Sequence, residues 1–117
     1  MTLYTGGTIL TPSTQLFATV NLDAIAHNIG VMQKFAGDTQ IMAVVKADAY
    51  GHGAIEVSKT ALAAGAVELG CATYEEAMRL RNSGIADAPI LFWLWGPSTP
   101  IEEALRANLM IAVAAEW

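Results

Sequence analysis

The chain has 117 residues, of which 54% are apolar and 15% are charged, so its composition excludes a disordered protein. Its formal net charge of −5 argues against nucleic acid as a partner, since phosphate binding requires a basic surface. The single cysteine, Cys71, cannot form an internal disulfide or a cysteine-based metal cluster, and an intracellular protein is therefore expected. The high apolar fraction favours a core that needs more covering than this short chain provides.

The first 22 residues carry no charge, so a targeting or membrane segment has to be considered. A secretory signal has a basic start and an unbroken apolar stretch, whereas glycines, threonines, a proline and a serine interrupt this segment. No stretch of the sequence reaches the ~18 apolar residues that a membrane-spanning helix requires. We therefore expect a cytoplasmic protein that does not bind a membrane.

Residues 1–16 have turn-forming composition and no helical period, which predicts an irregular arm before a domain over residues 17–117. A short strand is expected over residues 17–22. The following helix is predicted to begin with Asp23 as its N-cap and to end at Gly37. Apolar residues recur along this helix at steps of four, three and three, as on one face of a helix.

Four apolar runs come next, and each is typical of a strand that is buried on both faces of a parallel sheet. They cover residues 41–45, 69–72, 90–95 and 109–113.

Helices are predicted between these runs. One covers residues 54–64, and the next begins with a Thr-x-x-Glu capping box formed by Thr73 and Glu76. A third is expected to repeat this capping chemistry at Thr99, with Pro100 at its first helical position.

Strands that alternate with short helices indicate βα units on a parallel sheet. A closed (β/α)₈ barrel has eight strands, so four units fit either a small open α/β domain or the first half of such a barrel. A half barrel would leave two edge strands and an apolar interior uncovered. The high apolar fraction favours this second arrangement, so the predicted fold class is α/β, the first half of a (β/α)₈ TIM-like barrel.

The segment after the first apolar run carries the candidate chemistry. Lys46 ends that run and precedes a loop containing Gly51 and Gly53. Sites in parallel α/β folds are built at the carboxyl ends of strands, where a partly desolvated amine can form a Schiff base. The glycines allow a ligand close to the backbone and to the start of the next helix. From position alone, a solvated lysine, a packed Tyr50 and a hydrogen-bonding His52 are the commoner outcomes.

The string Val-Val-Lys-Ala-Asp-Ala-Tyr-Gly-His-Gly at residues 44–53 resembles the cofactor-lysine motif of alanine racemases. The similarity covers about residues 17–117. It continues in the opening strand and helix, in the two following helices and in the third strand, at residues 18–28, 61–66, 75–85 and 89–91.

The resemblance implies a (β/α)₈ barrel followed by a β domain, acting as a homodimer with pyridoxal 5′-phosphate. Lys46 is then the catalytic residue that holds the cofactor as an internal aldimine, and Tyr50 contacts the cofactor phosphate. Val44 lies two residues before Lys46 and points the same way from the strand, so it is expected to line the pocket. Trp93, on the third strand, is expected to lie against the cofactor.

Three features depart from the commonest family pattern. The third strand, with Trp93 and Trp95, is bulkier than usual, since many members have a smaller aliphatic residue against the cofactor. Asp48 stands where many members have Asn, and Cys71 stands where Val is frequent.

The implied reaction interconverts L-alanine and D-alanine and supplies D-alanine for cell-wall peptidoglycan. The cofactor acts as an electron sink, and racemisation needs a base on each face of the planar carbanion. Lys46 is one base. The second base, a tyrosine from the partner subunit, and the arginine that faces the pyridine nitrogen are expected beyond Trp117. The chain alone is therefore expected to be inactive.

Other interpretations stay open. A non-catalytic pyridoxal-phosphate binding module would keep the lysine and lack the second base. A racemase of serine or of a broader set of amino acids would differ in the pocket residues that choose the substrate. A half barrel that pairs with a second copy through its exposed edges would bind no cofactor.

Overall fold

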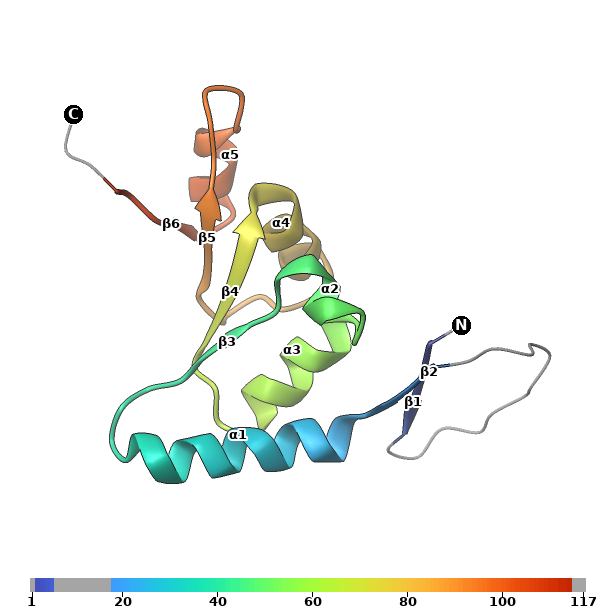
Figure 1. Cartoon of the computed structure of the whole chain (residues 1–117). Coiled ribbons are helices and arrows are strands. Elements are labelled where there is room, and N and C mark those ends of the chain that lie inside the picture. Colours follow the sequence, from blue (N-terminus) through green and yellow to red (C-terminus); the bar gives the residue numbers. More distant parts are fainter. Residues whose placement is uncertain (1, 6–17, 115–117) are drawn as a thin grey trace.

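The computed structural model describes residues 2–5 and 18–114. Its centre is a sheet of four parallel strands, in which each strand is paired with the next along the chain (Figure 1). In sheet order the strands are β3 (Met42–Val44), β4 (Glu68–Thr73), β5 (Ile90–Leu94) and β6 (Leu109–Ile111). The four predicted strands are confirmed, with ends that shift by one or two residues.

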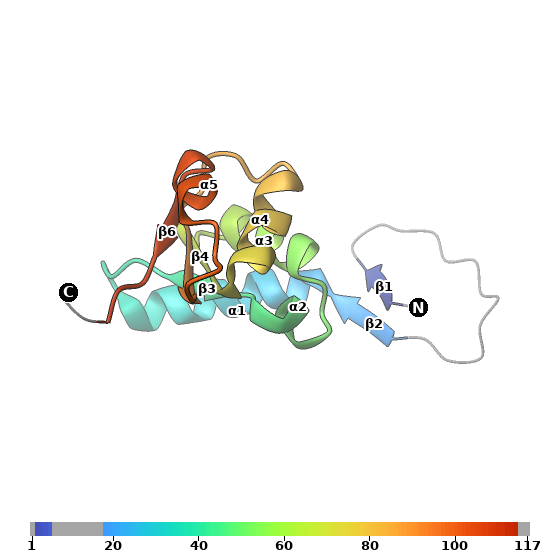
Figure 2. The ribbon, with the colours of Figure 1, turned by 90° about the horizontal axis from the view of Figure 1, so that it is seen from above.

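Helices connect these strands and pack on one face of the sheet (Figures 1 and 2). They are α3 (Ala54–Ala63), α4 (Tyr74–Asn82) and α5 (Ile101–Arg106), and a short element, α2 (Lys46–Tyr50), lies between β3 and α3. In the part of the chain that the structure describes, no helix has the length and apolar character needed to cross a membrane.

The core lies between the sheet and these helices. Alternate strand residues point toward the helices, as the period of two requires. The side chains with at most 1% exposure that meet there are Leu69, Cys71, Ala77, Leu80, Ile90, Phe92 and Ala104. Tyr74, at the start of α4, sets the edge of its ring against Phe92, with centroids 6.2 Å apart. The apolar runs of the sequence are therefore the inner layer of this core.

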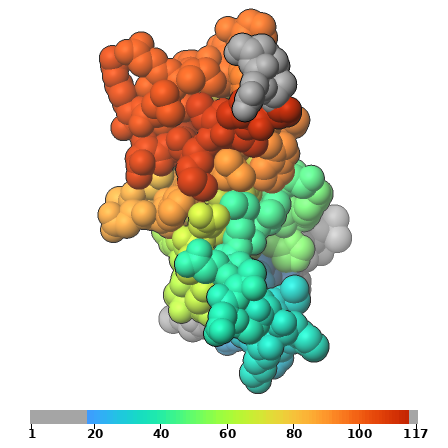
Figure 3. Space-filling view, turned by 90° about the vertical axis from the view of Figure 1, so that its left-hand side faces the viewer, coloured from blue at the N-terminus to red at the C-terminus, as the bar shows by residue number. Residues whose placement is uncertain are grey.

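None of the described elements covers the opposite face of the sheet. The strand register pairs Val44 with Gly70, Gly70 with Leu91 and Leu91 with Met110, which places these four residues on that face. Val44 remains 53% exposed. Figure 3 shows the segments of β3 to β6 reaching the surface together on this side. The sequence predicted such an uncovered apolar face for a half barrel.

The predicted irregular arm over residues 1–16 is wrong in one part. Residues Thr2–Thr5 form strand β1, which pairs in parallel with β2 (Ala18–Asn21) and makes a separate two-stranded sheet. Threonine and tyrosine have high strand propensity, and β2 offers an edge whose backbone groups need partners. The remainder of the arm, residues 6–16, lies outside the described residues.

Helix α1 (Leu22–Ala36) begins two residues earlier than predicted. Its N-cap is Asn21, whose Oδ1 accepts a hydrogen bond from the Ala24 N–H at 3.0 Å, and Asp23 lies in the first turn. Both residue types cap helices, and the cap falls where strand β2 ends. Phe35, on the predicted apolar side of this helix, is 85% exposed.

The two predicted capping sites differ in outcome. At α4 the capping box is confirmed, because the Glu76 N–H donates to Thr73 Oγ1 at 3.3 Å and the Glu76 carboxylate accepts from the Thr73 N–H. At α5 it is wrong: Pro100 is the N-cap, and Thr99 Oγ1 instead accepts from the Gly96 N–H at 3.0 Å. The Thr99 N–H donates back to the Gly96 carbonyl, so a tight turn occupies this hydroxyl.

Candidate functional site

Lys46 follows strand β3 at the carboxyl edge of the sheet. The preceding residue, Val45, is buried, and its N–H donates to the Gly70 carbonyl of β4 at 2.8 Å. This bond fixes the backbone where the lysine leaves the strand. Because the carboxyl ends of parallel strands meet at one edge, Lys46 lies where sites are built in folds of this class.

The chain after Lys46 forms a left-handed turn. Ala47, Asp48, Ala49 and Tyr50 have φ between +51° and +55°, although none of them is glycine. Each such residue costs about 1–2 kcal/mol, so four in succession cost roughly 4–8 kcal/mol. Strain of this size persists only where surrounding contacts determine the conformation, and it is typical of functional segments.

Specific hydrogen bonds hold this turn. The Ala49 N–H donates to the Val45 carbonyl at 2.9 Å, and the Ala47 N–H donates to Glu76 Oε1 on α4 at 2.7 Å. The Asp48 carboxylate accepts from the first N–H of α3, at 2.9 Å, and pairs with Arg79 at 3.4 Å. The turn is therefore tied to both α3 and α4.

The turn brings Tyr50 to Lys46. Lys46 Nζ lies 5.7 Å from the centroid of the Tyr50 ring, within the range of a cation–π contact. The Tyr50 side chain is 71% exposed, whereas Lys46 is half-buried. An amine and a phenol thus lie together at the carboxyl edge of the sheet.

Val44 and Trp93 meet across β4, at Gly70. A Cβ atom added to Gly70 would lie 3.2 Å from Val44 Cγ2, 3.2 Å from Trp93 Cζ3 and 3.0 Å from Met42 Sδ. The glycine therefore leaves the space that lets a strand β3 side chain approach the indole of β5. The structure thus brings Lys46 together with Tyr50, and Val44 together with Trp93, as two separate pairs.

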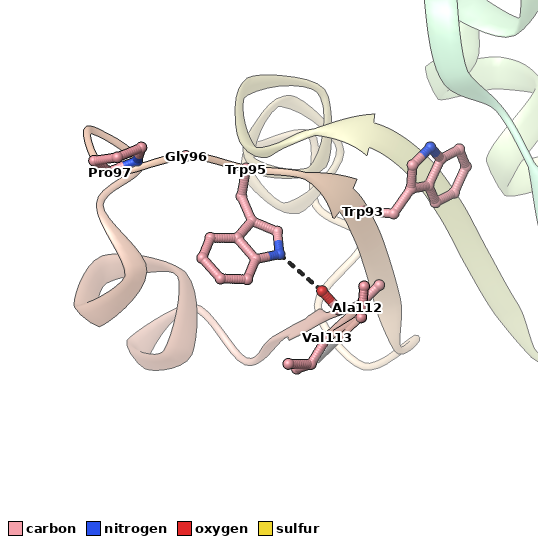
Figure 4. Close-up of a pocket in the computed structure, with 7 residues that line it drawn as sticks. Trp93, Trp95, Gly96, Pro97, Ala112 and Val113 are labelled. Carbon is pink, nitrogen blue, oxygen red and sulfur yellow. Dashed lines mark hydrogen bonds between the residues drawn. The ribbon is translucent and has the colours of Figure 1, made fainter. Parts of the chain in front are cut away.

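A concave apolar site lies farther along this edge, beyond the ends of β5 and β6 (Figure 4). Its volume is about 620 Å³, and its lining residues include Trp93, Trp95 and Val113 but neither Lys46 nor Tyr50. Figure 4 shows the two indoles diverging, with Trp95 Nε1 donating to the Ala112 carbonyl at 2.7 Å. Trp93 is thus the residue that borders both this cavity and the surface next to Val44.

Two further polar groups near the turn have local roles. His52 Nδ1 lies 2.9 Å from the Ala49 carbonyl, which is the local hydrogen bond expected of a loop histidine. Cys71 is 1% exposed, and burial, together with the nearby charge of Glu76, raises the pKa of its thiol to about 12. Cys71 is therefore inert at neutral pH rather than nucleophilic.

The sequence did not reveal the supporting contacts of this site. Glu76 was predicted only as a helix cap, and Asp48 and Arg79 received no structural role. The contact between Glu76 and Ala47 joins residues 29 positions apart, so it has no local sequence signal. Only the position of Glu76 at the start of a helix after the neighbouring strand could have indicated it.

Comparison with known proteins places these residues in context. The family described as "Alanine racemase, N-terminal domain" matches residues 20–117. The alanine racemase of Mycobacterium ulcerans (strain Agy99) is 53% identical over 106 residues, which are 91% of this chain and 27% of that protein.

Solved structures agree. The alanine racemase from Streptomyces coelicolor A3(2) has a TM-score of 0.80 and 44% identity, over 84% of this chain and 26% of that chain. The alanine racemase from Bartonella henselae with covalently bound pyridoxal phosphate has a TM-score of 0.72 and 26% identity, over 79% and 26%. The predicted half-barrel class is thereby confirmed. The chain spans about a quarter of the length of these relatives.

Proposed function

Because this chain belongs to the alanine racemase N-terminal domain family, we propose that it forms the part of an alanine racemase that holds the cofactor on Lys46. The whole protein interconverts L-alanine and D-alanine and supplies D-alanine for peptidoglycan. It acts in the cytoplasm as a homodimer, with pyridoxal 5′-phosphate as its cofactor. The relatives' names, and the cofactor named for the Bartonella henselae structure, support this assignment.

The placement of Lys46 carries the proposal. This lysine stands at the carboxyl end of β3, directly before a strained turn, with Tyr50 beside it. Pyridoxal phosphate needs an amine for its aldehyde, a donor for its phosphate and apolar surface for its ring. Lys46, Tyr50, and Val44 with Trp93 offer these three features, so the residues present fit the cofactor.

When bound, pyridoxal phosphate withdraws electrons from the α carbon of an amino acid and so makes the α-proton removable. Lys46 Nζ would hold the cofactor covalently until the substrate amine displaces it, and the freed lysine amine would then take or return that proton on one face of the substrate. The Tyr50 hydroxyl would donate a hydrogen bond to the cofactor phosphate. Val44 and Trp93 would exclude water from the side of the sheet.

Racemisation also needs a proton donor on the opposite face of the substrate. We assign this second base to the part of the relatives that this chain does not match, which is about three quarters of their length. The 117-residue chain alone is therefore expected not to exchange the α-proton of alanine with solvent deuterium. Stereospecific exchange by the purified chain would contradict this assignment.

The cofactor assignment is tested by mixing the purified chain with pyridoxal phosphate and recording its absorption after desalting. We expect a band near the visible edge that Lys46→Ala abolishes. Lys59→Ala is the matched control, because Lys59 lies exposed on α3 and pairs with Glu56 at 4.0 Å. A band that survives in Lys46→Ala, or is lost equally in Lys59→Ala, would overturn the assignment to Lys46.

A further inference from the structure

The carboxylate of Glu76 contacts three backbone N–H groups from two parts of the chain. Its Oε1 accepts from Ala47 at 2.7 Å, and its Oε2 accepts from Ala72 at 2.8 Å and from Thr73 at 3.3 Å. Ala47 belongs to the left-handed turn, whereas Ala72 and Thr73 end strand β4. We infer that Glu76 is a positioning residue that holds the turn after Lys46 against the end of β4.

Helix capping alone does not explain these contacts. A capping box needs the glutamate only for the N-cap N–H, here that of Thr73, which is the longest of the three bonds. The bond to Ala47 is the shortest and serves a different segment, 29 residues earlier in the chain. Element α2 lies beside the start of α4 at the tip of β4, so one side chain reaches both (Figure 1).

Only a carboxylate satisfies both sides at once. An ionised glutamate has two oxygens that accept hydrogen bonds, whereas a glutamine has one acceptor oxygen and a donor NH₂ group. Glutamine at this position would therefore direct its NH₂ at Ala47 or at Ala72 and lose that contact. Aspartate is one methylene shorter and would withdraw both oxygens from α2. Hydrogen bonds to a charged acceptor are also stronger than neutral ones.

The contact acts at the residue that decides the position of Lys46. Ala47 is the first residue of the left-handed turn and follows Lys46 directly. Fixing its N–H keeps the turn left-handed, and this conformation places the Tyr50 ring 5.7 Å from Lys46 Nζ. The catalytic meaning of this role rests on the proposed function of Lys46, whereas the contact itself can be tested without the cofactor.

The test is amide hydrogen exchange by nuclear magnetic resonance on the purified chain, with rates normalised to the buried Phe92 amide. In Glu76→Ala we expect the Ala47 amide to exchange about tenfold faster or more, because it loses a charge-assisted bond. The nuclear Overhauser contact between the Lys46 side chain and the Tyr50 ring should disappear. In Glu76→Gln, protection should be lost at Ala47 or at Ala72, and not kept at both.

Two matched variants separate positioning from capping and from charge. Thr73→Ala removes the hydroxyl that caps α4 but leaves the Glu76 carboxylate, so Ala47 should keep its protection. Glu75→Gln removes a neighbouring exposed charge and should change neither measurement. Unchanged exchange at Ala47 in both Glu76 variants, or an equal loss in Thr73→Ala, would overturn the inference.

A cofactor measurement keeps the two proposals distinguishable. If Lys46 binds pyridoxal phosphate, Glu76→Ala should lower the rate at which borohydride reduction fixes the cofactor to Lys46 by about tenfold. A wild-type chain that binds no cofactor would contradict the proposed function of this chain, and the exchange rates at Ala47 would still decide the role of Glu76.

Discussion

Helix α4 binds backbone groups near both of its ends, and the two ends serve opposite edges of the sheet. Near its start, the Glu76 carboxylate accepts hydrogen bonds from backbone N–H groups at the carboxyl edge. Near its end, the Arg81 guanidinium donates to carbonyl groups in the loops that lead into β5 and β6, at the amino edge. These carbonyls, 2.6–3.1 Å away, belong to Ile85, Ala86, Ala88, Ala107 and Asn108.

The difference between the edges lies in what these bonds hold. At the amino edge the half-buried Arg81 guanidinium holds two loops together through their carbonyl groups. None of the candidate catalytic residues lies at this edge. At the carboxyl edge Glu76 holds a strained turn next to the half-buried Lys46. In (β/α)₈ proteins the carboxyl edge carries the site and the amino edge carries stability. One helix thus supports both edges, with charges that also match its dipole.

Arg81 is expected to give the largest effect on stability. Arg81→Met should lower the free energy of unfolding by about 3 kcal/mol or more, because five carbonyls lose a charged donor. Urea denaturation measures the change. Arg106→Met is the matched control, since Arg106 is exposed and pairs with the exposed Glu102 one turn earlier, and it should cost less than about 0.5 kcal/mol. Equal losses of unfolding free energy in the two variants would show that the Arg81 contacts do not stabilise the amino edge.

Much of the sheet could be predicted because buried parallel strands have continuous apolar sequences. The capping box at Thr73 and Glu76 could also be predicted, since both partners lie within one turn of sequence. The cap of α1 was misplaced by two residues because Asn21 and Asp23 are both good N-caps, and the end of β2 decides between them.

The contacts that distinguish the two edges could not be predicted from the sequence. Arg81 reaches Asn108 over 27 residues, and Glu76 reaches Ala47 over 29 residues, so only the folded chain brings them together. A left-handed turn built without glycine contradicts local propensity, and its supports come from other elements. The lysine motif drew attention to Lys46 and Tyr50, whereas neither it nor the capping box indicated that Glu76 and Arg79 contact the turn.

Cys71 is buried in the core close to Glu76, and the pH dependence of stability tests whether its thiol is shielded from solvent. Burial and the nearby Glu76 raise the pKa of the folded thiol to about 12, from an ordinary value of 9.0. A pKa that is higher in the folded chain gives stability that is complete below about pH 9 and is lost as the pH rises toward 12. At about pH 10, Cys71 should cost about 1 kcal/mol of unfolding free energy.

The measurement compares urea denaturation of the wild-type chain and of Cys71→Ala at neutral and alkaline pH. Partial desolvation and the nearby Glu103 raise the pKa of Tyr74, so this group titrates in both chains and cancels in the difference. The wild-type chain should lose more stability with rising pH than the variant. Parallel pH profiles of the unfolding free energy in the two chains would show that solvent reaches the thiol, and Cys71 would then not belong to the closed core.

Substitutions of Asp48 test the carboxyl edge, and Asp48→Asn is expected to give one of the smallest effects on stability. Its Oδ1 accepts from the Ala54 N–H, where α3 begins, and its ion pair with Arg79 is exposed. Asp48→Ala should cost about 1 kcal/mol, the usual loss for a helix cap. Asp48→Asn keeps an acceptor oxygen and loses only the exposed pair, so it should cost less than about 0.5 kcal/mol.

Urea denaturation and exchange of the Ala54 amide distinguish the two contributions of Asp48. If Asp48→Asn keeps Ala54 protected while Asp48→Ala does not, the acceptor oxygen is what ties the turn to α3, and Asn serves this position equally well. If both variants lose protection equally, the charge pair with Arg79 holds the turn instead. The carboxyl edge would then depend on two charged contacts to α4, through Glu76 and Arg79, and a single helix would control the position of Lys46.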